Sequence, residues 1–255
     1  MNDILPPEKR MKFFVYIIES PSPVDLYHRR GEGDLLVQAI RLNRIPCIAR
    51  LAVNLEAFVA ALRIGLHEAM QATPDAIPIL HISAHGFQDG IQLCSGDIVT
   101  WTQLREVLVP INKALSGSLM VCMSTCEGYA GSRMAMVHDE PDHPYFAIIG
   151  NCGQPTWPET AVAFTTLYHL IANGRYLTDA VIAMRTASGN DAFFITTAEE
   201  SKQGYLEYIK NIDATQVMHQ LEVDREQSQA GGDLTKMLLT NSNHQQSSSG
   251  SPETD

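Results

Sequence analysis

The sequence has few cysteines, few basic residues and no long hydrophobic run. Its five cysteines are odd in number and lack close CxxC pairs, which argues against a disulfide framework or a zinc ribbon and favours a reducing cytoplasm. The 18 Lys and Arg residues stand against 29 Asp and Glu, a formal net charge of -11, so there is no basic footprint for a phosphate backbone. No apolar run approaches the roughly 20 residues of a membrane span. We therefore expect a cytoplasmic protein that neither binds nucleic acid nor spans a membrane.

Apolar runs typical of buried strands alternate with segments of helical periodicity. Strands are expected at residues 12–20, 45–53, 76–84, 118–126, 145–152 and 191–198. Helices are expected at 34–44, 55–70, 158–174, 177–189 and 202–212, with another from Trp101 that ends near Pro110. Asp34, Asn54 and Thr100 are expected to be helix N-caps. Such alternation predicts an α/β fold with a parallel sheet and helices on its faces.

Three segments lack this regularity. Residues 21–33 and 127–144 are expected to be long loops. From residue 213 the apolar periodicity fades, and the sequence becomes acidic and low in hydrophobic residues. We expect one folded domain over residues 1–212 and a flexible C-terminal tail over residues 213–255.

Two histidines four residues apart, His81 and His85, follow the apolar "IPIL" of the third predicted strand. In a strand such residues lie about 13 Å apart, too far to bind one metal, and no metal or cofactor is expected. His81 is interpreted as a buried strand histidine, hydrogen-bonded to the backbone. His85 comes at the strand's C-terminal end, where open α/β sheets place their reaction sites. Gly86 lets the backbone turn sharply there and brings an N–H group near the substrate.

Cys126 occupies the equivalent position on the fourth predicted strand, in "VCMSTCEG". If the two strands are neighbours, the imidazole of His85 can take the thiol proton and later protonate a leaving amine. The backbone N–H groups of Gly86 and Cys126 can bind the oxyanion of a tetrahedral intermediate. The remaining cysteines are interpreted as core or surface thiols: Cys47, Cys94, Cys122 and Cys152.

The sequence resembles the CHAT and caspase-like cysteine peptidases at "ILHISAHGFQDGIQL" and "LMVCMSTCEGYAG". In those proteins one strand ends in His-Gly and the next parallel strand ends in the nucleophilic Cys. The order of elements from Lys12 to about Ile212 is also similar. The resemblance implies a three-layer α/β/α sandwich with a mostly parallel six-stranded sheet. It also implies an endopeptidase with His85 as general acid/base, Cys126 as nucleophile, Gly86 as oxyanion donor and no essential third residue.

The resemblance is weaker in the substrate-binding residues. Ser124 stands where metacaspases have an acid that holds a basic substrate residue, so a preference for Arg or Lys is not implied. Arg29, in "HRRGEGD", loosely resembles the caspase Arg whose side chain holds a substrate aspartate. Together with Glu127, these residues are the candidates for binding a protein or peptide substrate. Control is expected from a separate activating or inhibitory partner, from the tail, or from cleavage in the 127–144 loop.

Two other functions compete with the peptidase. One is a catalytically silent caspase-like interaction module, which the presence of both His85 and Cys126 disfavours. The other is a flavodoxin-like or Rossmann-like nucleotide-binding enzyme, since a parallel sheet hosts many functions. No loop after a predicted strand matches G-x-G-x-x-G or a P-loop, which disfavours the second alternative. Selective thiol labelling of Cys126 would discriminate a dyad enzyme from a nucleotide binder.

Overall fold

The alternation of strands and helices expected from the hydrophobic pattern is present in the structure, a computed structural model that describes residues 4–138 and 140–212. The strands of the central sheet are β1 (Phe13–Ser20), β2 (Cys47–Leu51), β3 (Ile77–Phe87), β6 (Met120–Ser124), β7 (Ala147–Asn151) and β8 (Phe193–Thr197). They lie in the order β2-β1-β3-β6-β7-β8, and only β8 is antiparallel to its neighbour. The prediction of a mostly parallel sheet of six strands is confirmed.

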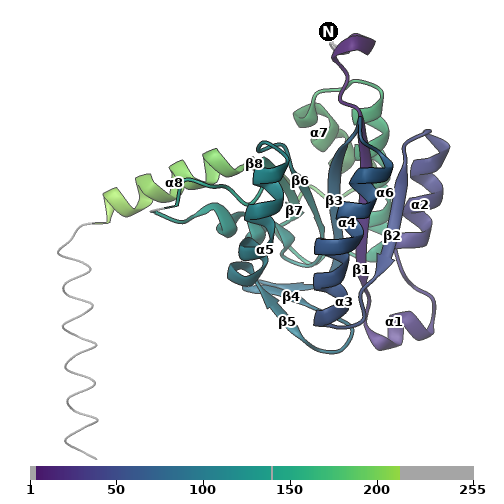
Figure 1. Ribbon diagram of the computed structural model, residues 1–255, viewed down its shortest axis with the longest axis horizontal. Coiled ribbons are helices and arrows are strands. Elements are labelled where there is room, and N and C mark those ends of the chain that lie inside the picture. The colour runs from purple at the N-terminus through teal and green to yellow at the C-terminus, as the bar shows by residue number, and fades with distance from the viewer. Residues whose placement is uncertain (1–3, 139, 213–255) are drawn as a thin grey trace, which may run out of the picture. The chain divides into compact units, whose positions relative to one another are not determined.

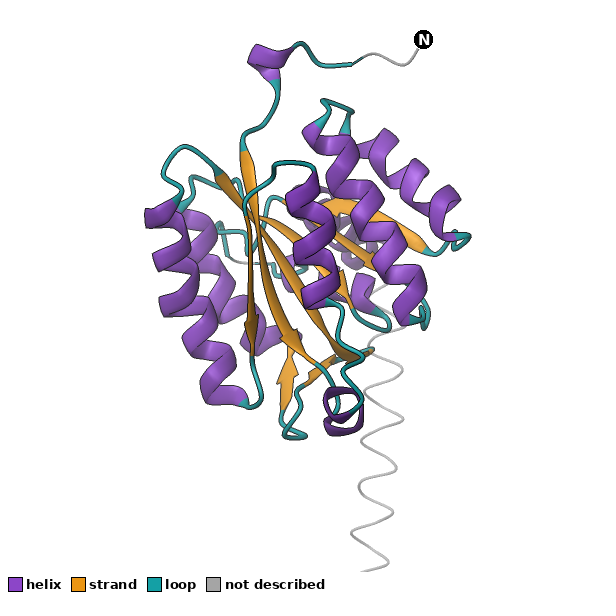
Figure 2. Ribbon diagram, turned by 90° about the vertical axis from the view of Figure 1, so that its right-hand side faces the viewer, coloured by secondary structure: helices purple, strands orange, loops and turns teal. Residues whose placement is uncertain are grey.

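Helices cover both faces of this sheet (Figure 1, Figure 2). One face packs against α2 (Gly33–Leu42), α6 (Trp157–Ala172) and α7 (Leu177–Ser188). The other packs against α3 (Leu55–Ala60), α4 (Leu66–Ala72), α5 (Trp101–Ala114) and the 3-10 helix η3 (Gly128–Ala135). Both faces of the sheet are apolar and have to be covered. In strand β1, for example, Tyr16 and Ile18 belong to one hydrophobic cluster and Val15 and Ile17 to the other. The predicted three-layer arrangement is confirmed.

The remaining elements are short, except for helix α8 with its 14 residues. They are η1 (Pro7–Lys9), α1 (Pro23–Tyr27), the π-helical turn η2 (Ala61–Gly65), β4 (Gly90–Gln92), β5 (Ile98–Thr100) and α8 (Ala198–Asn211). Strand β3 extends beyond the central sheet and pairs with β4, which pairs with β5. Helix α1 and this pair of short strands lie at the same end of the sheet, where the parallel strands terminate (Figure 1). The sequence predicts a functional site at this end of the sheet.

Helix α5 does not end near Pro110, as predicted, but continues to Ala114. A proline in a helix removes one backbone hydrogen bond and disfavours the turn before it. Here tertiary packing outweighs that cost, because Leu108 and Asn112 on either side are buried. The Asn112 side chain also bonds the backbone of His143 and Leu119 at 2.9 Å each. The last turn of the helix is therefore held by contacts distant in sequence.

Both segments predicted to be long loops contain a helical turn. The first contains α1 (Pro23–Tyr27), capped by Ser22, and the second contains η3 (Gly128–Ala135). The predicted cap Asp34 is wrong, since α2 begins one residue earlier and its N-cap residue is Glu32. A helix of 5 residues and a 3-10 helix of 8 residues are too short or too tightly wound to show the 3.6-residue period of an α-helix, so the hydrophobic pattern does not reveal them. The predicted caps of α3 and α5 are confirmed by their hydrogen bonds.

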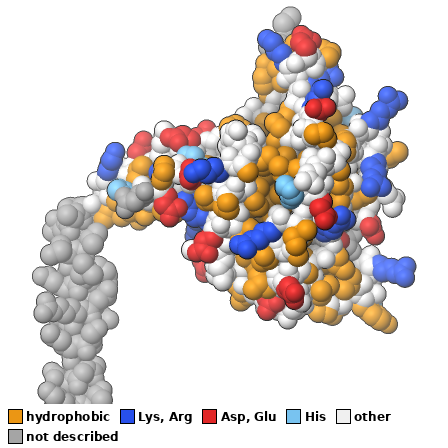
Figure 3. All heavy atoms as spheres, in the orientation of Figure 1, with side chains coloured by type: hydrophobic (Ala, Val, Ile, Leu, Met, Phe, Trp, Pro, Cys, Tyr) orange, Lys and Arg blue, Asp and Glu red, His pale blue; other side chains and the backbone are white. Residues whose placement is uncertain are grey.

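The chain divides into two compact units, residues 1–205 and 206–255. In the second unit the structure describes residues 206–212, and the predicted tail over 213–255 lies outside the described residues. No helix in the described part of the chain is long and apolar enough to cross a bilayer. On the face shown in Figure 3, acidic and basic side chains are interspersed among hydrophobic ones.

Candidate active site

The carboxyl ends of β3 and β6 carry His85 and Cys126, the two side chains that the sequence predicts to act together. These strands are neighbours, and their register sets Ser83 opposite Ser124. His85 and Cys126 each follow two residues later, and both line a cavity of about 290 Å³. The expectation that they end adjacent strands is confirmed, although β6 itself stops at Ser124 and β3 runs on to Phe87.

Gly86 lets the two strand ends approach each other. A Cβ atom at this position would lie 2.2 Å from the carbonyl oxygen of Cys126 and 2.7 Å from the Cβ atom of Thr125. No other residue fits this gap without moving the backbone. Its place beside Cys126 is compatible with the predicted oxyanion contact, which stays a prediction.

Cys126 is half-buried at a sharp turn of the chain. The next residue, Glu127, has a left-handed backbone with φ of 52°, and its N–H donates to the carbonyl of Gly153 at 2.7 Å. Non-glycine residues rarely adopt this conformation, and such exceptions gather at functional sites. Burial raises the pKa of the Cys126 thiol, the charge of Glu127 raises it further, and its own backbone N–H opposes both. The thiol therefore needs a base to become a nucleophilic thiolate at neutral pH.

The imidazole of His85 lies between a carboxylate and an aromatic ring. Its Nε2 atom is 3.5 Å from Oδ2 of Asp25, and its ring meets Trp157 edge-on with centroids 6.3 Å apart. Asp25 is fixed by the Ser22 hydroxyl, which donates to it at 2.7 Å, and by Arg30 at 3.4 Å. A carboxylate so placed orients an imidazole and stabilises its protonated form. No pattern in the sequence singles out Asp25, although it lies in the segment after β1, which begins at the same end of the sheet.

A buried polar cluster lies directly behind the cavity. Glu32 accepts hydrogen bonds from the hydroxyls of Ser124 at 2.6 Å and Ser83 at 2.9 Å, and its Oε2 lies 3.6 Å from Nε2 of His81. The prediction that His81 is buried in a strand is confirmed. Its hydrogen-bond partner is not the backbone but the hydroxyl of Tyr168, 2.8 Å from Nδ1. Glu32 was not singled out from the sequence either, because no local pattern marks an acid at a helix N-terminus as buried.

The other predicted site residues fall into two groups. Ser124 lines the cavity, and Glu127 adjoins it through Cys126. Arg29 is exposed in the turn after α1, with a left-handed backbone (φ of 54°), and does not belong to the described residues that line the cavity. Within residues 4–138 and 140–212, no group of three His, Cys, Asp or Glu side chains is arranged to hold a metal.

The remaining cysteines lie in surroundings unlike that of Cys126. Cys47 and Cys122 are buried, and burial raises the pKa of each thiol to about 12. Cys94 is half-buried and Cys152 is exposed. Their interpretation as core or surface thiols is confirmed.

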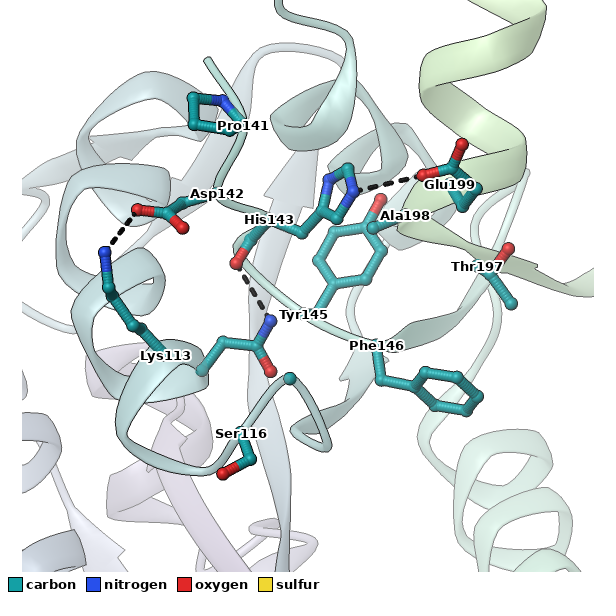
Figure 4. A pocket seen from close by; sticks show the side chains of 12 residues that line it. Lys113, Ser116, Pro141, Asp142, His143, Tyr145, Phe146, Thr197, Ala198 and Glu199 are labelled. Carbon is teal, nitrogen blue, oxygen red and sulfur yellow. Dashed lines mark hydrogen bonds and ion pairs between the residues drawn. The ribbon is translucent and has the colours of Figure 1, made fainter.

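A larger cavity, of about 550 Å³, lies beside the start of β7 (Figure 4). Cys126 follows the carboxyl end of β6, at the opposite end of the parallel strands. The charged side chains of the larger cavity are already paired, Lys113 with Asp142 at 2.9 Å and His143 with Glu199 at 3.2 Å. No cysteine is among the described residues that line it. Because it joins no nucleophile to a free base and lies at the amino ends of the parallel strands, the smaller cavity is the better candidate for catalysis.

No protein-family model and no curated protein matches the sequence. Among solved structures, the chain is similar to a secreted C11 cysteine protease from Bacteroides thetaiotaomicron, determined in complex with an irreversible peptide inhibitor. That likeness has a TM-score of 0.49 and 7% identity, and covers 74% of this chain and 67% of the other. The chain is also similar to drICE, with a TM-score of 0.44 and 14% identity over 74% of this chain and 88% of that one.

Proposed function

We propose that this protein is a cysteine endopeptidase of caspase-like fold, in which Cys126 is the nucleophile and His85 the general acid/base. One observation carries the proposal: the half-buried thiol and the imidazole line the same small cavity, at the carboxyl ends of adjacent parallel strands. A thiol beside a base is the arrangement that nucleophilic catalysis requires. The contact of Gly86 with Cys126 supports it, because that contact keeps the two strand ends together.

The reaction proceeds in two halves. As Sγ of Cys126 attacks the carbonyl carbon of the peptide bond, His85 takes the thiol proton, and the backbone N–H groups of Gly86 and Cys126 bind the oxyanion. The protonated imidazole then gives this proton to the leaving amine, the C–N bond breaks, and a thioester remains. His85 next removes a proton from water, which attacks the thioester. The acid product leaves, and the same proton returns to the thiolate.

Asp25 is part of this proposal as a positioning residue, in contrast to the dyad without a third member that the resemblance implies. Burial and the charge of Glu127 raise the pKa of Cys126, so the thiol needs a base that takes its proton, and His85 is that base. The carboxylate of Asp25, 3.5 Å away, stabilises the imidazolium that this transfer creates.

The proposed substrate is a protein or peptide. Helix α1, which carries Asp25, exposes the apolar side chains of Val24, Leu26 and Tyr27 beside the site. Exposed apolar groups that lie together are typical of protein-binding surfaces. Control by a separate activating or inhibitory partner and a location in the reducing cytoplasm belong to the same proposal.

The first experiment measures cleavage of fluorogenic peptides with Asp, Arg, Lys or Leu before the cut bond. The wild-type protein should cleave at least one class, and Cys126→Ala and His85→Ala should abolish cleavage while circular dichroism shows a retained fold. Cys152→Ala is the matched control, since it removes an exposed thiol just after the adjacent strand β7. Activity near wild type in either site variant would refute the proposal. Silence of the wild type, together with unselective alkylation of its thiols, would indicate an interaction module instead.

A further inference from the structure

The last residue of β7 is an asparagine, Asn151, whose side chain is fully buried. Strand β7 is the neighbour of β6, which leads to Cys126, so Asn151 lies at the same end of the sheet as the candidate active site. A buried amide is costly unless its oxygen and its nitrogen both have hydrogen-bond partners. The hydrogen bonds of Asn151 lead in two directions, toward the turn after Cys126 and toward helix α6.

The first direction leads to the turn that follows the proposed nucleophile. Oδ1 of Asn151 accepts from the N–H of Gly153 at 2.7 Å, and the carbonyl of Gly153 accepts from the N–H of Glu127 at 2.7 Å. Gly153 takes part through its backbone alone. The bond to Glu127 fixes the peptide plane between Cys126 and Glu127, and the carbonyl of this plane is the one that closely faces Gly86.

This peptide plane needs a constraint from outside the turn. Glu127 has a left-handed backbone, with φ of 52°, which is unfavourable for a residue with a Cβ atom. Without the bond to Gly153 the plane could rotate, and Glu127 could return to an ordinary conformation. The chain continues into η3, whose inner residues are buried, so the rotation would shift the backbone of Cys126 rather than that of η3. The thiol would then move relative to His85.

The second direction leads to the wall of the cavity. Nδ2 of Asn151 donates to Oδ1 of Asn190 at 3.1 Å, and Nδ2 of Asn190 donates to Oε1 of Glu159 at 3.3 Å. Glu159 completes the capping box of α6 by accepting from the N–H and the hydroxyl of Thr156, at 2.6 and 2.7 Å. Helix α6 begins with Trp157, which lines the cavity and meets the proposed catalytic imidazole edge-on.

We infer that Asn151 is a positioning residue of the proposed peptidase. Its single amide fixes the turn after the nucleophile and, through Asn190, the first turn of the helix that packs against the general base. The inference rests on the proposed function and adds the carboxyl end of β7 to the two strand ends that carry the dyad. Asn151 does not belong to the described residues that line the cavity, so it acts through its neighbours and not on the substrate.

A second buried asparagine provides the matched control. Asn112 also uses both ends of its amide, accepting from the Leu119 N–H and donating to the His143 carbonyl at 2.9 Å each. These partners precede β6 and β7, at the amino ends of the parallel strands. Asn112→Ala therefore removes the same number of side-chain hydrogen bonds as Asn151→Ala, but far from the site along the strands.

The test measures kcat and KM separately, together with Tm, for the peptide that the wild type cleaves best. Asn151→Ala should lower kcat at least tenfold, because a displacement of about 1 Å at the reacting groups can cost about 100-fold. It should leave KM within about twofold, because the substrate does not touch this residue. Asn151→Ser restores a weaker acceptor for the Gly153 N–H, so its loss of kcat should be only about threefold. Asn112→Ala should lower Tm similarly and leave kcat within about twofold of the wild type.

The outcomes separate this inference from the proposed function. Cys126-dependent cleavage with a wild-type kcat in Asn151→Ala overturns the inference and leaves the peptidase standing. A loss that Asn151→Ser does not reduce, or that Asn112→Ala reproduces, overturns it as well, because the effect would then be one of general stability. If Asn151→Ala does not fold, the serine variant decides, and an unchanged kcat in that variant overturns the inference.

A silent wild type is tested without turnover. Chloromethyl ketones of peptides that end in Asp, Arg, Lys or Leu are added, and labelling of Cys126 is followed by the mass of the protein. Labelling that is at least tenfold slower in Asn151→Ala than in the wild type, and unchanged in Asn112→Ala, supports the inference. Equal rates in all three proteins overturn it. Absence of labelling in the wild type overturns the proposed function and the inference together.

Discussion

Replacing Gly86 with alanine should remove most of the proposed activity while the protein stays folded. The added Cβ atom would lie 2.2 Å from the carbonyl oxygen of Cys126 and 2.7 Å from the Cβ atom of Thr125. Neither atom can rotate away, so the ends of β3 and β6 have to separate by about 1 Å, a displacement that can cost about 100-fold in rate. We therefore expect kcat/KM to fall by about 100-fold.

The same substitution has a bounded effect on stability. Overpacking of this kind costs about 1–3 kcal/mol. For a domain of about 200 residues this lowers Tm by about 2–12 °C, so the variant should be folded at the temperature of the assay. Peptide cleavage and thermal unfolding followed by circular dichroism are measured on the same preparations.

A matched control separates the close contact from the mere presence of a methyl group. At Gly153, also near the site, a Cβ atom would approach only Oδ1 of Asn151, at 3.4 Å, and the backbone is not left-handed. Gly153→Ala should therefore retain most of the activity. Wild-type kcat/KM in Gly86→Ala would refute the reasoning, because it would mean that the strand ends need not touch for the site to work.

Three further predictions test other contacts. Asp25→Asn removes the carboxylate 3.5 Å from the imidazole of His85, and should lower kcat/KM roughly fivefold, equivalent to about 1 kcal/mol for a half-exposed pair; an unchanged value would exclude Asp25 as a positioning residue. The charge of Glu127 helps to raise the pKa of the Cys126 thiol, so Glu127→Gln should lower that pKa and move the pH profile of iodoacetamide labelling to lower pH, and a shift to higher pH would contradict this. Tyr16→Phe removes a hydroxyl that donates to the Ala61 carbonyl at 2.9 Å on the other face of the sheet; we expect urea denaturation to show a loss of about 1–2 kcal/mol, with peptide cleavage unchanged.

The alternation of strands and helices was predictable because each element carries its own period of hydrophobic residues. The helix caps at Asn54 and Thr100 were also predictable, because the side chain of a cap residue bonds the backbone within the first turn of its own helix. His85 and Cys126 could be placed at one sheet edge because consecutive parallel strands end on the same side. These are local signals or follow directly from topology, so the sequence by itself determined the sheet and its two candidate catalytic residues.

The surroundings of those two residues were decided by the tertiary structure. Asp25 and Glu32 lie in a segment without helical or strand periodicity, and reach the site because β1 is the neighbour of β3. The partners of these two acids at the ends of β3 and β6 are about 50 to 90 residues away along the chain, at separations where no local pattern specifies a contact. Helix α5 passes through Pro110 for a similar reason, because long-range packing outweighs a local preference. The surroundings of the cavity therefore depend on which loops the completed sheet brings together.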